Sequence, residues 1–129
     1  MRFILVLLTL AFFTFSCKKE TSPDPSNPND KVVEYQFSAV NTSVLFNVTY
    51  NGKDSQTGGG NFASGWTTSF TQTELPFTAS LNIMNITAPS IPISVTQKIL
   101  VNGTVVKQAT TTLDAATGVV NKQIQYTVN

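Results

Sequence analysis

The sequence predicts an all-β fold, an antiparallel immunoglobulin-like sandwich of two sheets with about seven strands. From residue 32 onward apolar and polar residues alternate with a period of two, as they do in half-buried strands. Turn residues interrupt this alternation at short intervals, and threonine, which favours strands, occurs 16 times between residue 32 and the end. The 129 residues of the chain leave room for one domain of this kind.

The first two expected strands cover residues 32–40 (VVEYQFSAV) and 43–50 (SVLFNVTY), which both alternate regularly. The second strand ends at Asn51-Gly52, a strong turn signal because both residue types tolerate a positive φ. We expect these two strands to pair with each other.

The middle of the domain begins with three consecutive glycines, Gly58, Gly59 and Gly60. They lack the Gly-Lys-Ser/Thr ending of a phosphate-binding loop, so we interpret them as a flexible connection between strands. An extended run over residues 66–73 follows them. Residues 77–87 (FTASLNIMNIT) carry apolar side chains on both faces, which predicts a strand that is covered on both sides for part of its length.

The last third of the chain contains the remaining strands. Residues 91–113 form two strands around Asn102-Gly103, whose composition is typical of a type I′ hairpin, and residues 118–129 alternate again. Threonine, asparagine and glutamine fill most polar positions of the domain, so we expect its exposed faces to be neutral hydroxyl and amide surfaces. Between Tyr35 and Gln97 the charged residues are Lys53, Asp54 and Glu74.

The chain starts with the pattern of a secretion signal. Met1-Arg2 gives a short basic start, and residues 3–15 form a run of 13 residues interrupted only by two threonines. A membrane-spanning helix needs about 20 apolar residues, so an uncleaved anchor helix is the less favoured alternative.

Cys17, the one cysteine of the chain, follows this apolar run directly. Residues 14–17 (TFSC) resemble the lipobox of bacterial lipoproteins, in which a small residue precedes a cysteine that is diacylated and becomes the first residue of the mature chain. The resemblance implies that Cys17 is a lipidation site and that the acyl chains hold the protein at a membrane. A buried structural thiol and a redox cysteine are the alternatives, but neither explains this position.

We therefore expect three segments: a signal peptide over residues 1–16, the lipidated cysteine with a proline-rich tether over residues 17–31, and the β-sandwich domain over residues 32–129. An extended proline-rich tether rises ~3.1 Å per residue, so it could hold the domain up to about 40 Å from the bilayer. Loss of the signal peptide removes Arg2 and leaves seven basic and seven acidic residues. With scattered lysines and no basic patch, we expect no nucleic-acid partner.

Catalytic and metal-binding chemistry finds little support in the sequence. Histidine is absent, which excludes Ser-His-Asp triads and the common zinc sites. The carboxylates between residue 32 and the end are Glu34, Asp54, Glu74 and Asp114. They form no cluster of the kind that calcium requires, and a glycosidase would need two of them ~5 Å apart. We expect a protein that is not an enzyme and that carries no metal or other cofactor.

Trp66, which lies between Gly65 and Thr67, has two interpretations. On an exposed face it would stack against a sugar ring, with Tyr50 or Phe62 as a second platform. Between the two sheets it would fill the core, the interpretation that we favour because large aromatic side chains dominate core energetics.

Two resemblances bear on location and fold. The segment FSCKKE resembles the signal ending of lipoproteins of the Bacteroidota, which implies an anchor in the cell envelope, with the outer membrane favoured and its side left open. The order and spacing of three landmarks resemble the MmpS-like β-sandwich domain: VEYQFS followed by VLFNVTYNG, then ELPFTASL, then ISVTQKILVNGTVVKQATTT. In mycobacteria the small membrane proteins of that family are accessory to lipid and siderophore exporters, so the resemblance implies a role beside a transport complex.

The sequence thus predicts a non-enzymatic, lipid-anchored protein of the cell envelope. Its sandwich is expected to bind another envelope component, foremost a protein, and a transport complex is one candidate. The alternative is a small carbohydrate-binding module that uses Trp66, Tyr50 and Phe62 to hold a glycan. Members of the MmpS-like family have a membrane helix where we expect a lipid anchor in this chain, and no functional residue can be mapped from them.

Overall fold

The computed structural model describes residues 27–40, 44–86, 89–114 and 121–129, and the structural statements below concern these residues. They form an all-β sandwich, as the sequence predicts, with one strand more than expected. The strands are β1 (Lys31–Ala39), β2 (Phe46–Asn51), β3 (Thr57–Phe62), β4 (Thr67–Gln72), β5 (Phe77–Asn85), β6 (Ile93–Val101), β7 (Thr104–Leu113) and β8 (Asn121–Val128). A short 3₁₀ turn, η1 (Lys53–Ser55), lies between β2 and β3. Cys17 and the signal segment lie outside the described residues.

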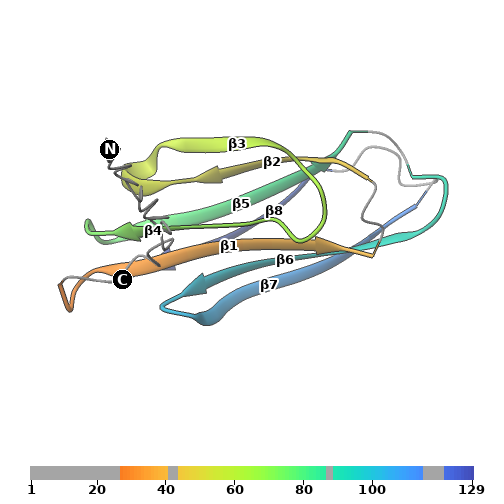
Figure 1. The fold of residues 1–129 in the computed structure, drawn as a ribbon. Coiled ribbons are helices and arrows are strands. Elements are labelled where there is room, and N and C mark those ends of the chain that lie inside the picture. The colour runs from red at the N-terminus through yellow and green to blue at the C-terminus, as the bar shows by residue number, and fades with distance from the viewer. Residues whose placement is uncertain (1–26, 41–43, 87–88, 115–120) are drawn as a thin grey trace, which may run out of the picture.

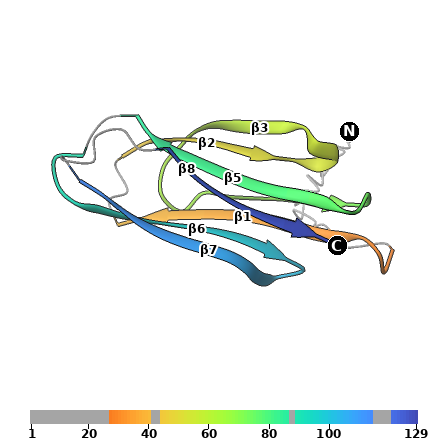
Figure 2. The same ribbon diagram turned by 180° about the vertical axis from the view of Figure 1, so that it is seen from behind.

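The strands form two four-stranded antiparallel sheets. Sheet A has the order β4-β1-β6-β7 and sheet B the order β3-β2-β5-β8. Figures 1 and 2 show the two sheets stacked face to face, with the edge strands β3 and β4 on one side of the sandwich and β7 and β8 on the other. Each sheet therefore has one face in the core and one face toward solvent.

The prediction that the first two strands pair with each other is wrong. β1 lies in sheet A between β4 and β6, whereas β2 lies in sheet B between β3 and β5. Asn51-Gly52 does not form a two-residue turn either, because the connection continues through η1 and the positive φ angles fall on Asp54 (56°) and Ser55 (62°). The alternation of a strand specifies which of its faces is buried but not which strand lies beside it, so the pattern could not reveal the partner.

The interpretation of the three glycines as a flexible connection is also wrong. Gly58, Gly59 and Gly60 form the centre of β3, the edge strand of sheet B, and pair with β2 in regular register. A Cβ atom at Gly58 would overlap the ring of Tyr50, and one at Gly60 would lie 3.1 Å from the ring of Phe62. The glycines are thus needed because neighbouring rings occupy the space that their own side chains would fill.

The predicted hairpin at Asn102-Gly103 is confirmed. Both residues have positive φ angles, 50° and 77°, as a type I′ turn requires. The hairpin is also tied to the start of β1, because the Val32 N–H donates to Asn102 Oδ1 at 2.9 Å and the Asn102 N–H donates to the Val32 carbonyl at 2.8 Å. The end of the domain at which β1 begins is therefore held together by backbone and amide hydrogen bonds.

The core lies between the sheets and consists of the inward-facing residues of both. Its buried apolar members are Val33, Tyr35, Phe37, Phe46, Val48, Phe77, Ala79, Leu81, Ile83, Ile93, Val95, Ile99, Leu113, Ile124 and Val128. The outward residues of β5 are Thr78, Ser80, Asn82 and Met84, of which Ser80 is buried and Asn82 and Met84 are half-buried. The second apolar side that the sequence suggests is therefore reduced to Met84, because Ile86 lies just beyond the strand and is exposed.

Tyr35 connects the two sheets through the core. Its side chain is fully buried in sheet A, and its hydroxyl donates a hydrogen bond to the Asn51 carbonyl in sheet B at 2.6 Å. The same oxygen accepts the Ser80 N–H at 3.3 Å. Burial raises the pKa of Tyr35 well above that of a free tyrosine, Tyr50 adds to this rise, and the bond from Ser80 opposes it.

Gln97 makes a second polar connection between the sheets. This side chain of β6 is 2% exposed, and its Nε2 donates to the carbonyls of Leu81 and Lys122, both at 3.2 Å. Because Leu81 belongs to β5 and Lys122 to β8, one amide joins β6 to two strands of sheet B. A buried Nε2 group that bonds two strands of the opposite sheet in this way helps to fix how the two sheets lie relative to each other.

We predict that Tyr35→Phe lowers the free energy of unfolding by about 1–3 kcal/mol, because two hydrogen bonds inside the core are lost. Tyr126→Phe is the matched control, since Tyr126 is exposed and its change should stay within about 0.5 kcal/mol. Chemical denaturation of the three proteins at neutral pH measures both values. Equal stability of Tyr35→Phe and the wild type would contradict the role of the hydroxyl.

The stability gap between wild type and Tyr35→Phe should also depend on pH. The pKa of Tyr35 is higher in the folded chain than in the unfolded chain, where tyrosine ionises near ~10. The stabilisation is therefore complete below pH ~10 and declines by about 1.4 kcal/mol per pH unit above it, since only the unfolded chain then loses the proton. A gap that stays constant from pH 8 to pH 11 would contradict this.

Candidate functional site

The aromatic residues nominated by the sequence lie next to one another at the side of the sandwich where β3 and β4 are the edges. Trp66, immediately before β4, stacks on Phe62 with ring centres 5.0 Å apart and contacts Tyr50 at 5.5 Å. Phe37 of β1 lies 6.1 Å from Trp66 on the core side. We call Tyr50, Phe62 and Trp66 the aromatic cluster; all three are half-buried.

Local backbone bonds place Trp66 in this position. The Phe37 N–H donates to the Trp66 carbonyl at 3.1 Å, and the Gly65 N–H donates to the Phe37 carbonyl at 3.2 Å. Gly65 has a φ of 87°, which a residue with a side chain rarely adopts. Ser64 holds the preceding turn to the end of β1, because its hydroxyl bonds both the N–H and the carbonyl of Ala39 at 2.7 Å. The rings of the cluster pack against one another and close this side of the sandwich.

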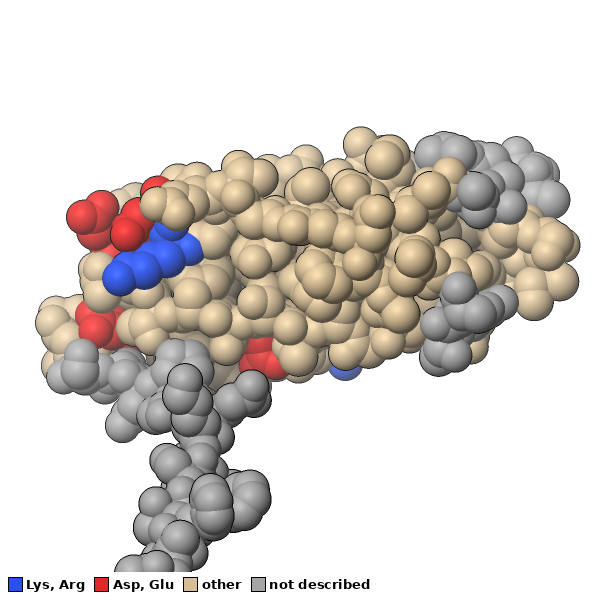
Figure 3. All heavy atoms as spheres, turned by 45° about the horizontal axis from the view of Figure 1, so that its top comes forward, with Lys and Arg blue, Asp and Glu red and all other residues tan. Residues whose placement is uncertain are grey.

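The outward face of sheet B, which we call the amide face, carries no charged side chain. The strand register places three neighbouring rows across β3, β2, β5 and β8: Thr57, Asn51, Ser80 and Gln125; Gly59, Thr49, Asn82 and Gln123; Asn61, Asn47, Met84 and Asn121. Figure 3 views the molecule with this side turned forward and shows Lys, Asp and Glu gathered at one end and along the lower margin. A broad neutral surface of amides and hydroxyls remains.

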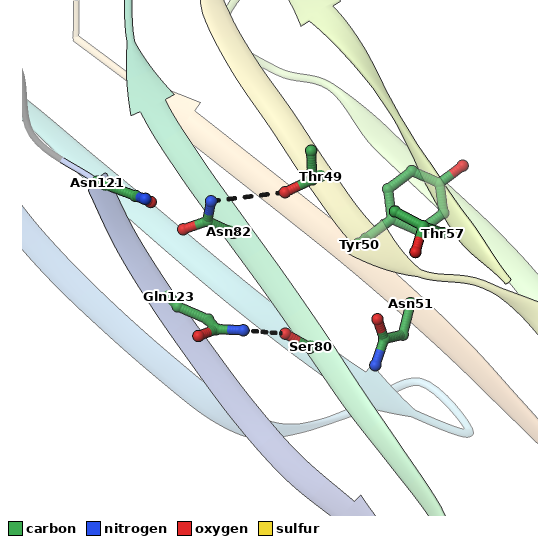
Figure 4. Close-up of a pocket in the computed structure, with 8 residues that line it drawn as sticks. All are labelled: Thr49, Tyr50, Asn51, Thr57, Ser80, Asn82, Asn121 and Gln123. Carbon is green, nitrogen blue, oxygen red and sulfur yellow. Dashed lines mark hydrogen bonds between the residues drawn. The ribbon is translucent and has the colours of Figure 1, made fainter. Parts of the chain in front are cut away.

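A hollow of about 300 Å³ lies in the amide face, and we call it the amide trough. It is lined by Thr49, Tyr50, Asn51, Thr57, Ser80, Asn82, Asn121 and Gln123, which come from all four strands of the sheet (Figure 4). Gln123 Nε2 donates to Ser80 Oγ at 2.7 Å, and Asn82 Nδ2 makes a long bond of 3.5 Å to Thr49 Oγ1. Asn82 Oδ1 is buried and has no hydrogen-bond partner among the described residues.

Sequence analysis predicted neutral outer faces but not this trough. Its residues come from segments that are far apart in the chain, and only the pairing of Thr49 with Asn82 and of Asn82 with Gln123 brings them together. The available signal was the row of uncharged amides at alternate positions of β8, Asn121, Gln123 and Gln125. Tyr50 belongs both to the trough and to the aromatic cluster, so the two features adjoin.

Sheet A offers less for binding. On this side the nominated Trp66 borders a hollow of about 280 Å³ whose lining residues are Gln36, Phe37, Ser38, Gly65, Trp66, Thr67, Thr96 and Lys98. The carboxylate of Glu34 on this face is bonded by Gln36 Nε2 at 2.6 Å and by the Thr67 hydroxyl at 3.0 Å. No group of three or more Cys, Asp or Glu residues in the described part of the chain could hold a metal ion. In the same part of the chain, no helix has the length and apolar character to cross a bilayer.

No protein-family model matches the chain, and no curated protein matches it. The resemblances to Bacteroidota lipoproteins and to the MmpS-like domain therefore stay predictions that rest on the sequence landmarks. The function has to be argued from the geometry of the two sheet faces and from the start of the chain.

We predict that Gly58→Ala lowers the free energy of unfolding by about 1–3 kcal/mol, because the new methyl group overlaps the ring of Tyr50. Thr57→Ala, at the exposed neighbouring position, should change it by less than about 0.5 kcal/mol. In a Tyr50→Leu background, Gly58→Ala should lower the free energy of unfolding by less, because the leucine side chain leaves space for the new methyl group. Thermal and chemical denaturation test the series, and an undiminished cost in that background would contradict the assignment of the overlap.

Proposed function

We propose that this protein is a non-enzymatic, lipid-anchored component of the bacterial cell envelope and that its sandwich binds another envelope component through the amide face. The uncharged character of that face supports the proposal more than any other observation. Charged residues make up 12% of the chain, about half of the ~25% usual in soluble domains, and the amide face has none.

An uncharged sheet face suits binding because the centres of protein interfaces are depleted in charge. A lysine or glutamate at such a place would have to lose its water on docking, which is costly when no opposite charge meets it. Solvent-exposed edge strands, by contrast, usually carry lysine or proline to prevent association, and β3 has neither. The amide face and the adjoining edge strand β3 therefore lack the features that keep a surface free of partners.

The start of the chain supports the envelope location. Residues 14–17 resemble a lipobox, and the described domain begins shortly after the proline-rich segment that follows. In this arrangement Cys17 carries the acyl chains, and the tether leads to the start of β1 at Lys31. The MmpS-like resemblance implies an accessory role beside a transport complex as one form of this proposal.

We predict that Cys17→Ser abolishes membrane anchoring, because a serine hydroxyl is not the nucleophile that accepts the diacylglyceryl group. The variant should appear in the soluble fraction or keep its signal peptide, and Lys18→Ser should behave like the wild type. Fractionation combined with intact-mass measurement distinguishes these forms. A processed Cys17→Ser protein that still sediments with membranes would contradict the lipid anchor.

We predict that Asn61→Lys and Gln125→Lys each reduce crosslinking to envelope components more than tenfold, because a charge buried without a partner costs about 3–5 kcal/mol. Both positions are exposed in the isolated domain, so the thermal midpoint should stay close to that of the wild type. Gln108→Lys, an exposed amide in sheet A, is the matched control. Unchanged crosslinking in both amide-face variants would remove this face from the proposal.

A further inference from the structure

We infer that the amide trough binds an uncharged sugar chain, so that the envelope component recognised by this protein is a neutral glycan. The inference rests on the proposed function, because it names the chemistry of the partner. It differs from the hypothesis of an aromatic platform, since it places the ligand on the outward face of sheet B, over Asn82 and Gln123, rather than on the faces of Trp66 and Phe62.

The hydrogen-bonding groups of the trough match those of a sugar. Each asparagine or glutamine amide offers two donors and an acceptor oxygen, and each serine or threonine hydroxyl both donates and accepts. Sugar hydroxyls have the same double character, so a row of amides and hydroxyls can bond them without any net charge. An anionic ligand would need lysine or arginine and a cationic one would need a carboxylate, and neither lines the trough.

Asn82 provides the most specific observation. Its Oδ1 atom is buried and lacks a partner among the described residues, and the contact of its Nδ2 with Thr49 is long, at 3.5 Å. A buried acceptor without a donor costs free energy, and a bound hydroxyl would recover it once the Asn82 amide turns this oxygen toward the trough. Figure 4 shows this amide in the middle of the trough, between Thr49 and Asn121. The central residue of the trough is thus the one whose bonding is incomplete.

Hydrogen bonds hold the floor of the trough in place before any ligand binds. The Tyr35 hydroxyl bonds the backbone of Asn51 and of Ser80 from the core side, directly beneath two of the lining residues. Gln123 is held by its bond to Ser80 Oγ. A preformed arrangement avoids the cost of ordering side chains on binding, which is a large part of the cost of recognising a flexible chain.

The size of the face favours a sugar chain over a broad protein partner. Four strands ~4.8 Å apart and about seven residues long give a face of about 400 Å², roughly half of the ~800 Å² that each protein contributes to a typical stable interface. The hollow of about 300 Å³ is at the lower end of the range of small-molecule sites. A chain one sugar wide could cross it from β8 toward β3, where Gly59 presents no side chain.

The test uses the full chain in a detergent without a sugar headgroup and titrates it calorimetrically with neutral gluco-, manno- and xylo-oligosaccharides. Polygalacturonate serves as the anionic probe. We expect at least one neutral oligosaccharide to bind with a dissociation constant that hardly changes with salt, because no charges meet. Asn82→Ala and Gln123→Ala should each weaken this binding at least threefold, as loss of a neutral hydrogen bond predicts, whereas Gln108→Ala in sheet A should not.

Other outcomes overturn the inference in distinct ways. If no neutral oligosaccharide binds while the charge variants of the amide face still abolish crosslinking, the sugar is wrong and the proposed function stands. If a sugar binds but its affinity falls in Trp66→Phe and not in Asn82→Ala, the aromatic cluster is the site. Salt-sensitive binding of polygalacturonate alone would show that charge decides recognition. Circular dichroism of each variant confirms that a lost signal does not reflect unfolding.

Discussion

The hydroxyl of Tyr35 is the interaction on which both the packing and the candidate site depend. Two sheets that touch only through apolar side chains have many packings of similar free energy, because the hydrophobic effect has no direction. The hydrogen bonds of Tyr35 with Asn51 and Ser80 form in only one of these packings. The bonds of the Gln97 amide, on the neighbouring strand β6, require the same packing. Since Asn51 and Ser80 also line the amide trough, the connection that aligns the sheets also shapes the candidate site.

The glycines of β3 impose a second constraint, on the side of the sandwich opposite β7 and β8. An edge strand with large inward side chains would compete with the aromatic cluster for the same space, whereas Gly58 and Gly60 leave room for the rings of Tyr50 and Phe62. The rings of Tyr50 on β2 and of Phe62 at the end of β3 then supply the apolar contact that the glycines lack, and Trp66 stacks on Phe62 to close the gap toward β4. The backbone of β3 therefore stays close to β2 while the space beside its glycines is filled by these rings.

These two constraints explain how far the sequence could be interpreted. Local signals were sufficient where the chain determines its own geometry: the alternation of β1, β6 and β8 and the turn at Asn102-Gly103 were predicted correctly. They failed where a residue serves a distant neighbour. Three consecutive glycines indicate a loop unless it is known that the ring of Tyr50 occupies the space beside Gly58. Asn82 resembles any solvent-facing amide in the sequence, because only the strand pairing places Thr49 and Gln123 beside it. The trough depends on the register between neighbouring strands, and the alternation of apolar and polar residues does not specify this register.

The neutral character of the amide face supports stability and is compatible with the recognition that we propose. Cross-strand amide and hydroxyl pairs such as Asn47 with Asn61 and Gln123 with Ser80 support the sheet in the way that opposite charges do elsewhere. Unlike ion pairs, they keep unused donors and acceptors, so the same side chains can bond a ligand without first breaking a pair. Charges would make the surface more soluble but would also have to be desolvated on docking. A domain held at a membrane by a lipid anchor depends less on surface charge for solubility, which is consistent with the uncharged face that the proposed function requires.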